Sequence, residues 1–249
     1  MTRPIDTHAA VLFDLDGVIT PTAEVHRLAW KRTFDQVLSA HQGDAAHGDT
    51  AQEFSIEDYL TYVDGKPRYD GVHSFLRSRG IDLPSGDPSD RPSLDTEAGI
   101  GNLKNDEFNA VLEHTGVAPY PGSVALIDHL VRAGVEVAIV SSSANARGVL
   151  TAAGLIDRFD VIIDGVAARA RELPGKPAPD TFLAAARDLG VAAADAVVIE
   201  DAISGVEAGV AGGFGLVVGV DREGHAPALR AAGAHVVVND LADLVPAIS

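Results

Sequence analysis

Short runs of Val, Ile and Ala alternate with helical patterns along much of the chain, and this rhythm limits the possible fold more than any other feature. The runs lie at 135–140, 161–163, 196–199, 214–220 and 235–238, and a similar run at 10–13 opens a first strand over 10–14. Continuous apolar runs of this kind are typical of parallel strands that are buried on both faces. Strands that alternate with helices therefore predict an α/β fold with a doubly wound parallel sheet.

One of the intervening helices has an apolar stripe. Val124, Ile127, Leu130 and Val131 recur at helical spacing, and Gly134 follows where a C-terminal cap belongs. We expect these four side chains to pack against the sheet.

The segment between the first strand and residue 119 has a different pattern of apolar and polar residues. It lacks comparable Val and Ile runs, and its helical patterns are separated by two long polar loops at 39–55 and 82–93. Loops of that length inside a compact domain are usually functional or mobile. We therefore expect a helical cap domain over 22–118, inserted into a core domain that consists of 1–21 and 119–249.

The charge balance excludes several classes of partner. The 249 residues have a formal net charge of −17, whereas a protein that binds nucleic acid or an anionic membrane needs a basic surface. The most apolar stretches are interrupted by charges, so we expect neither a membrane span nor a signal segment. Cysteine is absent, which excludes disulfides and fits a reducing compartment. We expect a cytoplasmic monomer.

Polar side chains follow the strands at the edge where an open α/β sheet binds its ligands. Asp14 and Asp16 follow the first strand, and in an extended chain they point to the same side, where two like charges need a cation or a shared proton. The later strands are followed by Ser141, Ser142, Ser143 and Asn145, then by Lys176, and then by Glu200 and Asp201. Hydroxyls and a lysine suit a phosphate, and clustered carboxylates suit Mg²⁺. The set predicts phosphoryl transfer.

These motifs resemble those of the haloacid dehalogenase superfamily of phosphotransferases. The signature Asp-x-Asp-Gly-Val-x-Thr begins at Asp14, and the insertion lies where that superfamily has a helical cap on a Rossmann-like core. The resemblance implies that Asp14 is the nucleophile and that Asp16 is the general acid and base. It also implies that Ser141 and Lys176 hold the transferring phosphate. The implied Mg²⁺ ligands are Asp14, the backbone carbonyl of Asp16, Glu200 and Asp201.

Within the superfamily, the cap is most similar to the β-phosphoglucomutase family. The similarity lies in "AEVHRLAWKRTF" and "YVDGKPRYDGVHSFLRSRGI". It implies that Arg68, aided by Ser143 and Asn145, binds the phosphate that is not being transferred, and that Lys104 lies beside His26. A lysine of that family aligns with Asp64, and Lys66 stands in for it. The implied substrate-binding set is His26, Gly65, Lys66, Arg68, Lys104, Ser142, Ser143 and Asn145, for a small phosphorylated sugar.

Other interpretations stay open. A sugar-phosphate phosphatase of the same superfamily would let water attack the phosphorylated aspartate, whereas a mutase must exclude water and hold a second phosphate. A phosphorylation-switched binding module would stay phosphorylated without turnover. The cap residues also fit structural roles, with His26 packed, Trp30 in the core, and Arg68 and Lys104 solvated.

Overall fold

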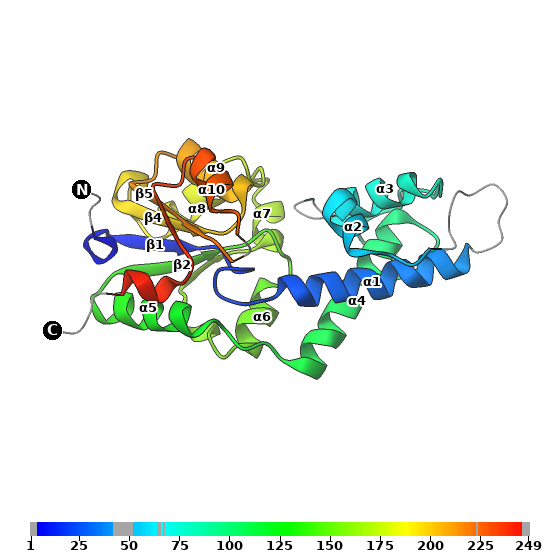
Figure 1. The fold of residues 1–249 in the computed structure, drawn as a ribbon, viewed down its shortest axis with the longest axis horizontal. Helices are drawn as coiled ribbons and strands as arrows, with labels where there is room; N and C mark the ends of the chain where they lie inside the picture. The colour runs from blue at the N-terminus through cyan, green and yellow to red at the C-terminus, as the bar shows by residue number, and fades with distance from the viewer. Residues whose placement is uncertain (1–3, 42–51, 64–65, 67, 223, 246–249) are drawn as a thin grey trace. The chain divides into compact units, whose positions relative to one another are not determined.

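The computed structural model describes residues 4–41, 52–63, 66, 68–222 and 224–245, and the chain forms two compact units. Unit 1 comprises Met1–Thr22 and Val117–Ser249, and unit 2 comprises Ala23–Gly116. Unit 2 is thus inserted after the first strand of unit 1. Figure 1 shows the strands in unit 1 and a group of helices in unit 2.

Unit 1 contains a six-stranded parallel sheet with the strand order β3-β2-β1-β4-β5-β6. The strands are β1 (Ala10–Phe13), β2 (Glu136–Val140), β3 (Val161–Ile163), β4 (Ala196–Glu200), β5 (Leu216–Val220) and β6 (Val236–Val238). β1, β4 and β5 are buried along their whole length, as continuous apolar runs require. The predicted doubly wound α/β fold is confirmed.

The sheet grows in both directions from β1. β2 and β3 lie on one side of β1, and the chain then crosses back to add β4, β5 and β6 on the other side. Phe13, the last residue of β1, lies beside Ile139 of β2 and Ile199 of β4. The residues that follow these three strands therefore meet at a topological switch point, where open α/β sheets bind ligands.

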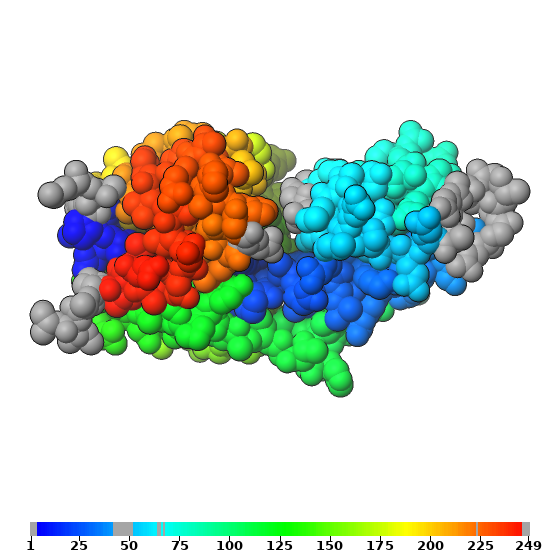
Figure 2. All heavy atoms as spheres, viewed as in Figure 1, coloured from blue at the N-terminus to red at the C-terminus, as the bar shows by residue number. Residues whose placement is uncertain are grey.

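Helices cover both faces of this sheet, because strands are added in opposite directions on the two sides of β1 and right-handed crossovers then place their helices on opposite faces. α5 (Pro121–Arg132) and α6 (Ala146–Ala152) lie on one face, and α8 (Asp180–Asp188), α9 (Ile203–Ala211) and α10 (Ala226–Ala231) lie on the other (Figure 1). α7 (Gly165–Ala170) follows β3, and short 3-10 helices occupy Ile5–Thr7, Ile156–Arg158, Ala193–Asp195 and Leu241–Leu244. In the space-filling view, orange and red atoms of residues late in the chain form much of the front surface of unit 1 (Figure 2).

The apolar stripe predicted for α5 is partly wrong. Ile127 and Leu130 are buried, but Val131 is 44% exposed and Leu126 is buried in addition. The buried face contains Ser123, Leu126, Ile127 and Leu130, which recur at intervals of three and four residues. Ser123 Oγ also donates a hydrogen bond to the Val18 carbonyl in the loop after β1. Val131 lies about 100° around the helix from Leu130, which places it outside this face.

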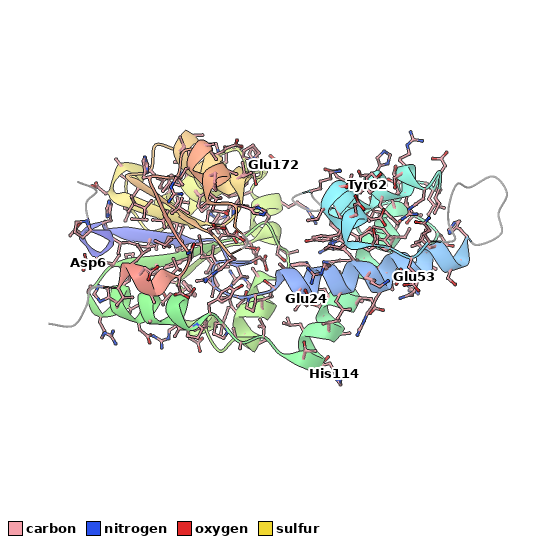
Figure 3. All side chains as sticks on the ribbon, in the orientation of Figure 1. Asp6, Glu24, Glu53, Tyr62, His114 and Glu172 are labelled. Atoms are coloured by element: carbon pink, nitrogen blue, oxygen red, sulfur yellow. The ribbon has the colours of Figure 1, made fainter. Side chains whose placement is uncertain are left out.

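Unit 2 packs its helices around an aromatic core. Its elements are α1 (Ala23–Ala40), α2 (Ile56–Asp58), the π turn Tyr59–Val63, α3 (Arg68–Ser78) and α4 (Glu97–Thr115). The rings of Phe34 and Phe75 lie 4.1 Å apart, and Phe54 lies 5.0 Å from each. Tyr62 packs on Phe75 at the edge of this core (Figure 3). Loop 82–93 is described in full, whereas residues 42–51 of the other long loop lie outside the described residues.

No helix in the described parts of the chain is both long enough and apolar enough to cross a membrane.

Candidate active site

Asp14 stands directly after β1 at the switch point. Its backbone N–H continues the strand pairing by donating to the Ile199 carbonyl at 2.9 Å, and its side chain is buried. The Nζ of Lys176 lies 2.6 Å from Asp14 Oδ1 and 2.6 Å from Glu200 Oε1. The same ammonium donates to the Val140 carbonyl at 3.0 Å. One lysine therefore connects the ends of β1, β2 and β4.

Burial dominates the electrostatics of this cluster. It raises the pKa of Asp14 to about 8, an effect that Lys176 opposes and that Glu200 and Asp16 increase. Burial lowers the pKa of Lys176, but Asp14 and Glu200 together raise it above its ordinary value. Burial also raises the pKa of Asp201, and the nearby carboxylates add to that rise. The carboxylates outnumber the ammonium, so the site favours a further cation.

Three of the carboxylates are arranged to hold such a cation. One oxygen from each of Asp14, Glu200 and Asp201 lies within 4.8 Å of the others. Two glycines permit this approach, because a Cβ on Gly17 would overlap the carboxylate of Asp201 and one on Gly205 would overlap that of Glu200. Hard oxygen donors at this spacing fit Mg²⁺.

Asp16 has different partners from Asp14. Its carboxylate accepts a hydrogen bond from the hydroxyl of Thr22, and its backbone forms a bridge with Thr20. β1 ends at Phe13, so strand alternation does not determine where the Asp16 side chain points. The two aspartates are nevertheless close enough for Asp16 to raise the pKa of Asp14.

The predicted residues after β2 form one compact turn. Ser141 is buried, and its Oγ accepts a hydrogen bond from the Ser143 N–H at 3.0 Å. Ser143 Oγ accepts in turn from the Asn145 N–H at 3.1 Å. Ser142 is exposed, and the Gly165 N–H donates to the Ser143 carbonyl at 3.0 Å. The structure thus brings these four predicted residues together at the end of β2.

In unit 2, His26 and Lys104 form a pair. Lys104 is only 4% exposed, so a solvated role for it is wrong, and its Nζ donates to His26 Nδ1 at 2.7 Å. The ammonium lies 5.1 Å from the ring centre of Trp30 and 4.9 Å from that of Phe108. Trp30 belongs to the buried core of this unit. Aromatic faces stabilise a cation that is withdrawn from water.

Arg68 and Lys66 lie at the start of α3 and just before it, in unit 2. Arg68 is the first residue of α3, and its Nη2 donates to Asn105 Oδ1 at 2.8 Å. Lys66 is exposed, and its Nζ donates to Ser74 Oγ at 2.8 Å. Gly65, which the sequence places in the substrate loop, lies outside the described residues.

Sequence reasoning missed several residues that contact this machinery. Thr22 binds Asp16 and Asn105 binds Arg68, and neither position carries a motif. Arg222 donates from Nε to the Gly17 carbonyl at 3.2 Å, and its guanidinium lies 3.9 Å from the ring centre of Tyr120. Arg222 follows β5 at the same edge of the sheet, so the rule that ligand-binding groups follow strands could have found it.

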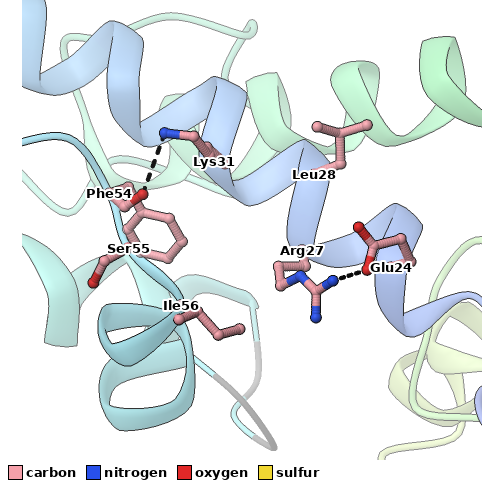
Figure 4. A pocket seen from close by; sticks show the side chains of 7 residues that line it. All are labelled: Glu24, Arg27, Leu28, Lys31, Phe54, Ser55 and Ile56. Carbon is pink, nitrogen blue, oxygen red and sulfur yellow. Dashed lines mark hydrogen bonds and ion pairs between the residues drawn. The ribbon is translucent and has the colours of Figure 1, made fainter.

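A pocket of about 180 Å³ in unit 2 involves other residues (Figure 4). It is lined by Glu24, Arg27, Leu28, Lys31, Phe54, Ser55 and Ile56. Its charged groups are engaged: Glu24 pairs with Arg27, and Lys31 donates to the Phe54 carbonyl at 3.3 Å and pairs with Asp35 at 2.8 Å. The chemistry suggested by the sequence therefore lies outside this pocket.

Comparison with known proteins identifies the family. The chain matches the model of the haloacid dehalogenase-like hydrolases over residues 8–213. The chain belongs to this family. It is 49% identical over 240 residues to the protein named beta-phosphoglucomutase from Mycobacterium tuberculosis (strain CDC 1551 / Oshkosh), covering 95% of this chain and 91% of the relative.

Two further relatives agree with this assignment. Beta-phosphoglucomutase from Bacillus subtilis is 32% identical over 239 residues, covering 94% of this chain and 91% of the relative. The crystal structure of a CbbY variant from Rhodobacter sphaeroides in complex with xylulose-(1,5)-bisphosphate matches with a TM-score of 0.70 and 26% identity, covering 95% of this chain and 96% of that one. The resemblance inferred from the sequence is confirmed, and the chain is an enzyme of the phosphotransferase, isomerase or phosphatase type.

Proposed function

We propose that the protein is a β-phosphoglucomutase, which converts β-glucose 1-phosphate to glucose 6-phosphate through glucose 1,6-bisphosphate. The observation that carries the proposal is the likeness to curated relatives of that name over nearly the whole chain. The cluster of Asp14, Lys176 and further carboxylates supports it, because phosphoryl transfer depends on a placed nucleophile and on compensation of charge. We further propose that the enzyme acts as a cytoplasmic monomer on a small phosphorylated sugar.

Asp14 is the proposed nucleophile. A carboxylate oxygen attacks the C1 phosphorus of glucose 1,6-bisphosphate, the bond from that phosphorus to the C1 oxygen breaks, and protonated Asp16 gives its proton to that oxygen, so that glucose 6-phosphate leaves. In the return transfer, the C6 hydroxyl of β-glucose 1-phosphate attacks the aspartyl phosphate, gives its proton to Asp16 and regenerates the bisphosphate. Lys176, at 2.6 Å from Asp14 Oδ1, favours the ionised carboxylate and offsets its repulsion of the phosphate.

Mg²⁺ is the proposed cofactor. The side chains of Asp14, Glu200 and Asp201 and the backbone carbonyl of Asp16 would hold it, and the spacing of the three carboxylates supports this set. When bound, the ion would supply positive charge against the transferring phosphoryl group. We expect EDTA to abolish turnover and added Mg²⁺ to restore it. Mg²⁺ at a hundred times its dissociation constant should also raise the free energy of unfolding by about 2.7 kcal/mol.

A mutase needs two phosphate sites, and the remaining predicted residues supply them in this proposal. Ser141 and Lys176 hold the phosphate at Asp14, and Arg68, Ser143 and Asn145 hold the other one. Because a guanidinium binds a phosphate through two parallel hydrogen bonds, Arg68 suits the distal site. The substrate-binding set is completed by His26, Gly65, Lys66, Lys104 and Ser142.

The deciding assay follows glucose 6-phosphate and inorganic phosphate from the same sample of β-glucose 1-phosphate, with catalytic amounts of the 1,6-bisphosphate. A mutase forms glucose 6-phosphate faster than inorganic phosphate, and Arg68→Ala lowers isomerisation more than hydrolysis. The second candidate is a sugar-phosphate phosphatase, which the description of the family as hydrolases favours. If inorganic phosphate accumulates faster at saturating bisphosphate, the phosphatase replaces the mutase.

A further inference from the structure

Helix α4 carries two asparagines that each bind one residue at the start of α3. Asn105 Oδ1 accepts a hydrogen bond from Arg68 Nη2 at 2.8 Å, and Asn102 Oδ1 accepts one from the Tyr69 hydroxyl at 3.0 Å. Residues three apart lie on the same face of a helix. One face of α4 therefore holds two consecutive residues of α3.

Gly101 allows the close approach of these two helices. A Cβ at this position would lie 2.7 Å from Tyr69 Cδ1 and 3.3 Å from Arg68 Cδ. The first of these distances is shorter than a carbon contact allows, so a larger residue would displace the ring. The Arg68 guanidinium also lies 5.9 Å from the ring centre of Tyr69. A displaced ring would therefore change the position of the guanidinium as well.

The long polar loop 82–93 supports Asn102. The amide nitrogen of Asn102 donates to the Pro88 carbonyl at 3.1 Å and to the Asp90 carbonyl at 2.9 Å. Two other carbonyls of the loop accept from N–H groups in the first turn of α4, at 2.9 and 3.0 Å. Both amide hydrogens and the oxygen of Asn102 are engaged, which determines its orientation.

The chemistry of asparagine suits the task of orienting an arginine that binds an anion. An amide oxygen fixes the direction of a guanidinium and leaves its positive charge intact. A carboxylate at position 105 would form a stronger bond to Arg68, but it would neutralise the charge and compete with a phosphate.

We propose that Asn105 is a positioning residue that orients Arg68 toward the anionic group of the substrate, supported by Asn102 and the loop 82–93. The inference rests on the proposed function, in which Arg68 binds the phosphate that is not transferred. It assigns a role to a loop for which sequence reasoning found none.

A double-mutant cycle on Arg68 and Asn105 tests this inference. Arg68→Ala, Asn105→Ala and the double variant are assayed for kcat and KM with the sugar phosphate that the wild-type enzyme turns over. We expect Asn105→Ala to raise KM by about tenfold, which is typical for loss of a hydrogen bond to a charged group. The same substitution should have no further effect when Arg68 is already alanine. Additive effects on KM, or an unchanged KM in Asn105→Ala, would overturn the inference.

Two variants separate positioning from a structural role. Asn105→Asp keeps an acceptor of the same size, so a purely structural role predicts a KM near that of the wild type. The proposal predicts that KM rises at least as much as in Asn105→Ala, because the carboxylate neutralises Arg68. Asn109→Ala makes the matched substitution at an exposed asparagine of the same helix, and it should leave KM unchanged. Thermal unfolding of each variant identifies any loss of fold.

Failure of the proposed function would give a different result. A wild-type enzyme that hydrolyses the sugar phosphate without isomerising it refutes the mutase, whereas a wild-type enzyme that isomerises it, with an unchanged KM in Asn105→Ala, overturns the inference alone. An Arg68→Ala variant with the KM of the wild type overturns the inference together with the distal-phosphate role of Arg68, because Asn105 would then have no anion-binding group to position; the product assay still decides between mutase and phosphatase.

Discussion

Replacing Lys176 by methionine removes the positive charge from the centre of the catalytic cluster. The Lys176 side chain is 7% exposed and its Nζ lies 2.6 Å from both Asp14 and Glu200. Methionine preserves much of the volume, so the main change is that two buried carboxylates lose their counter-charge. Removing one partner of a buried ion pair costs about 3–5 kcal/mol. We expect the free energy of unfolding to fall by about this amount at pH 8 without Mg²⁺.

The loss in free energy of unfolding caused by Lys176→Met should grow with pH. Burial raises the pKa of Asp14 from an ordinary 3.8 to about 8 in the folded protein. Protonation of Asp14 therefore stabilises the folded state fully below pH 3.8, and that contribution is lost as the pH rises to about 8. Without Lys176 the pKa of Asp14 rises further. Near pH 8 the wild-type carboxyl begins to ionise beside Lys176 and stops losing stability, whereas the carboxyl of the variant stays neutral and continues to lose it. The difference from the wild type should be larger at pH 8 than at pH 5.

Urea unfolding at pH 5 and pH 8 measures both effects. Lys31→Met is the matched control, because Lys31 is 42% exposed and pairs with Asp35 at 2.8 Å and Glu53 at 2.9 Å. Exposed pairs of this kind contribute about 0–1 kcal/mol. The reasoning is refuted if Lys176→Met loses less than about 1 kcal/mol at pH 8, or if its loss is greater at pH 5.

Three further substitutions act on the same site. Asp14→Asn should abolish turnover, because an amide cannot form the aspartyl phosphate, and the variant should still fold, because the size and polarity of the side chain change little; turnover by the folded variant would remove Asp14 as the nucleophile. Asp16→Ala should lower kcat by about 10²- to 10⁴-fold, as expected for a general acid and base, and a loss of only a few fold would assign the proton transfer to another group. Gly17→Ala should weaken Mg²⁺ binding in a calorimetric titration, because Gly17 has a φ of 79° and a Cβ there would overlap the Asp201 carboxylate; affinity equal to that of the wild type would contradict this.

The sequence by itself determined which groups meet at the edge of the sheet. The continuous Val and Ile runs predict buried parallel strands, and parallel strands end at one edge. Asp14 follows β1, Ser141 follows β2 and Glu200 is the last residue of β4. The closeness of these three residues therefore follows from local sequence patterns and one topological rule. The helical insertion followed in the same way, from the absence of such runs before residue 119.

Apart from Lys104 beside His26, which the family resemblance implied, only the tertiary structure decided which side chains bind one another. Lys176 reaches Asp14 across 162 residues, and Arg68 binds Asn105 across 37. Spacing predicted Ile127 and Leu130 as buried, but it could not show that Val131 faces away from the sheet. The physical reason is that periodicity records the backbone conformation and one buried face of a single element, whereas a side-chain pair depends on how loops and packing bring two distant elements together.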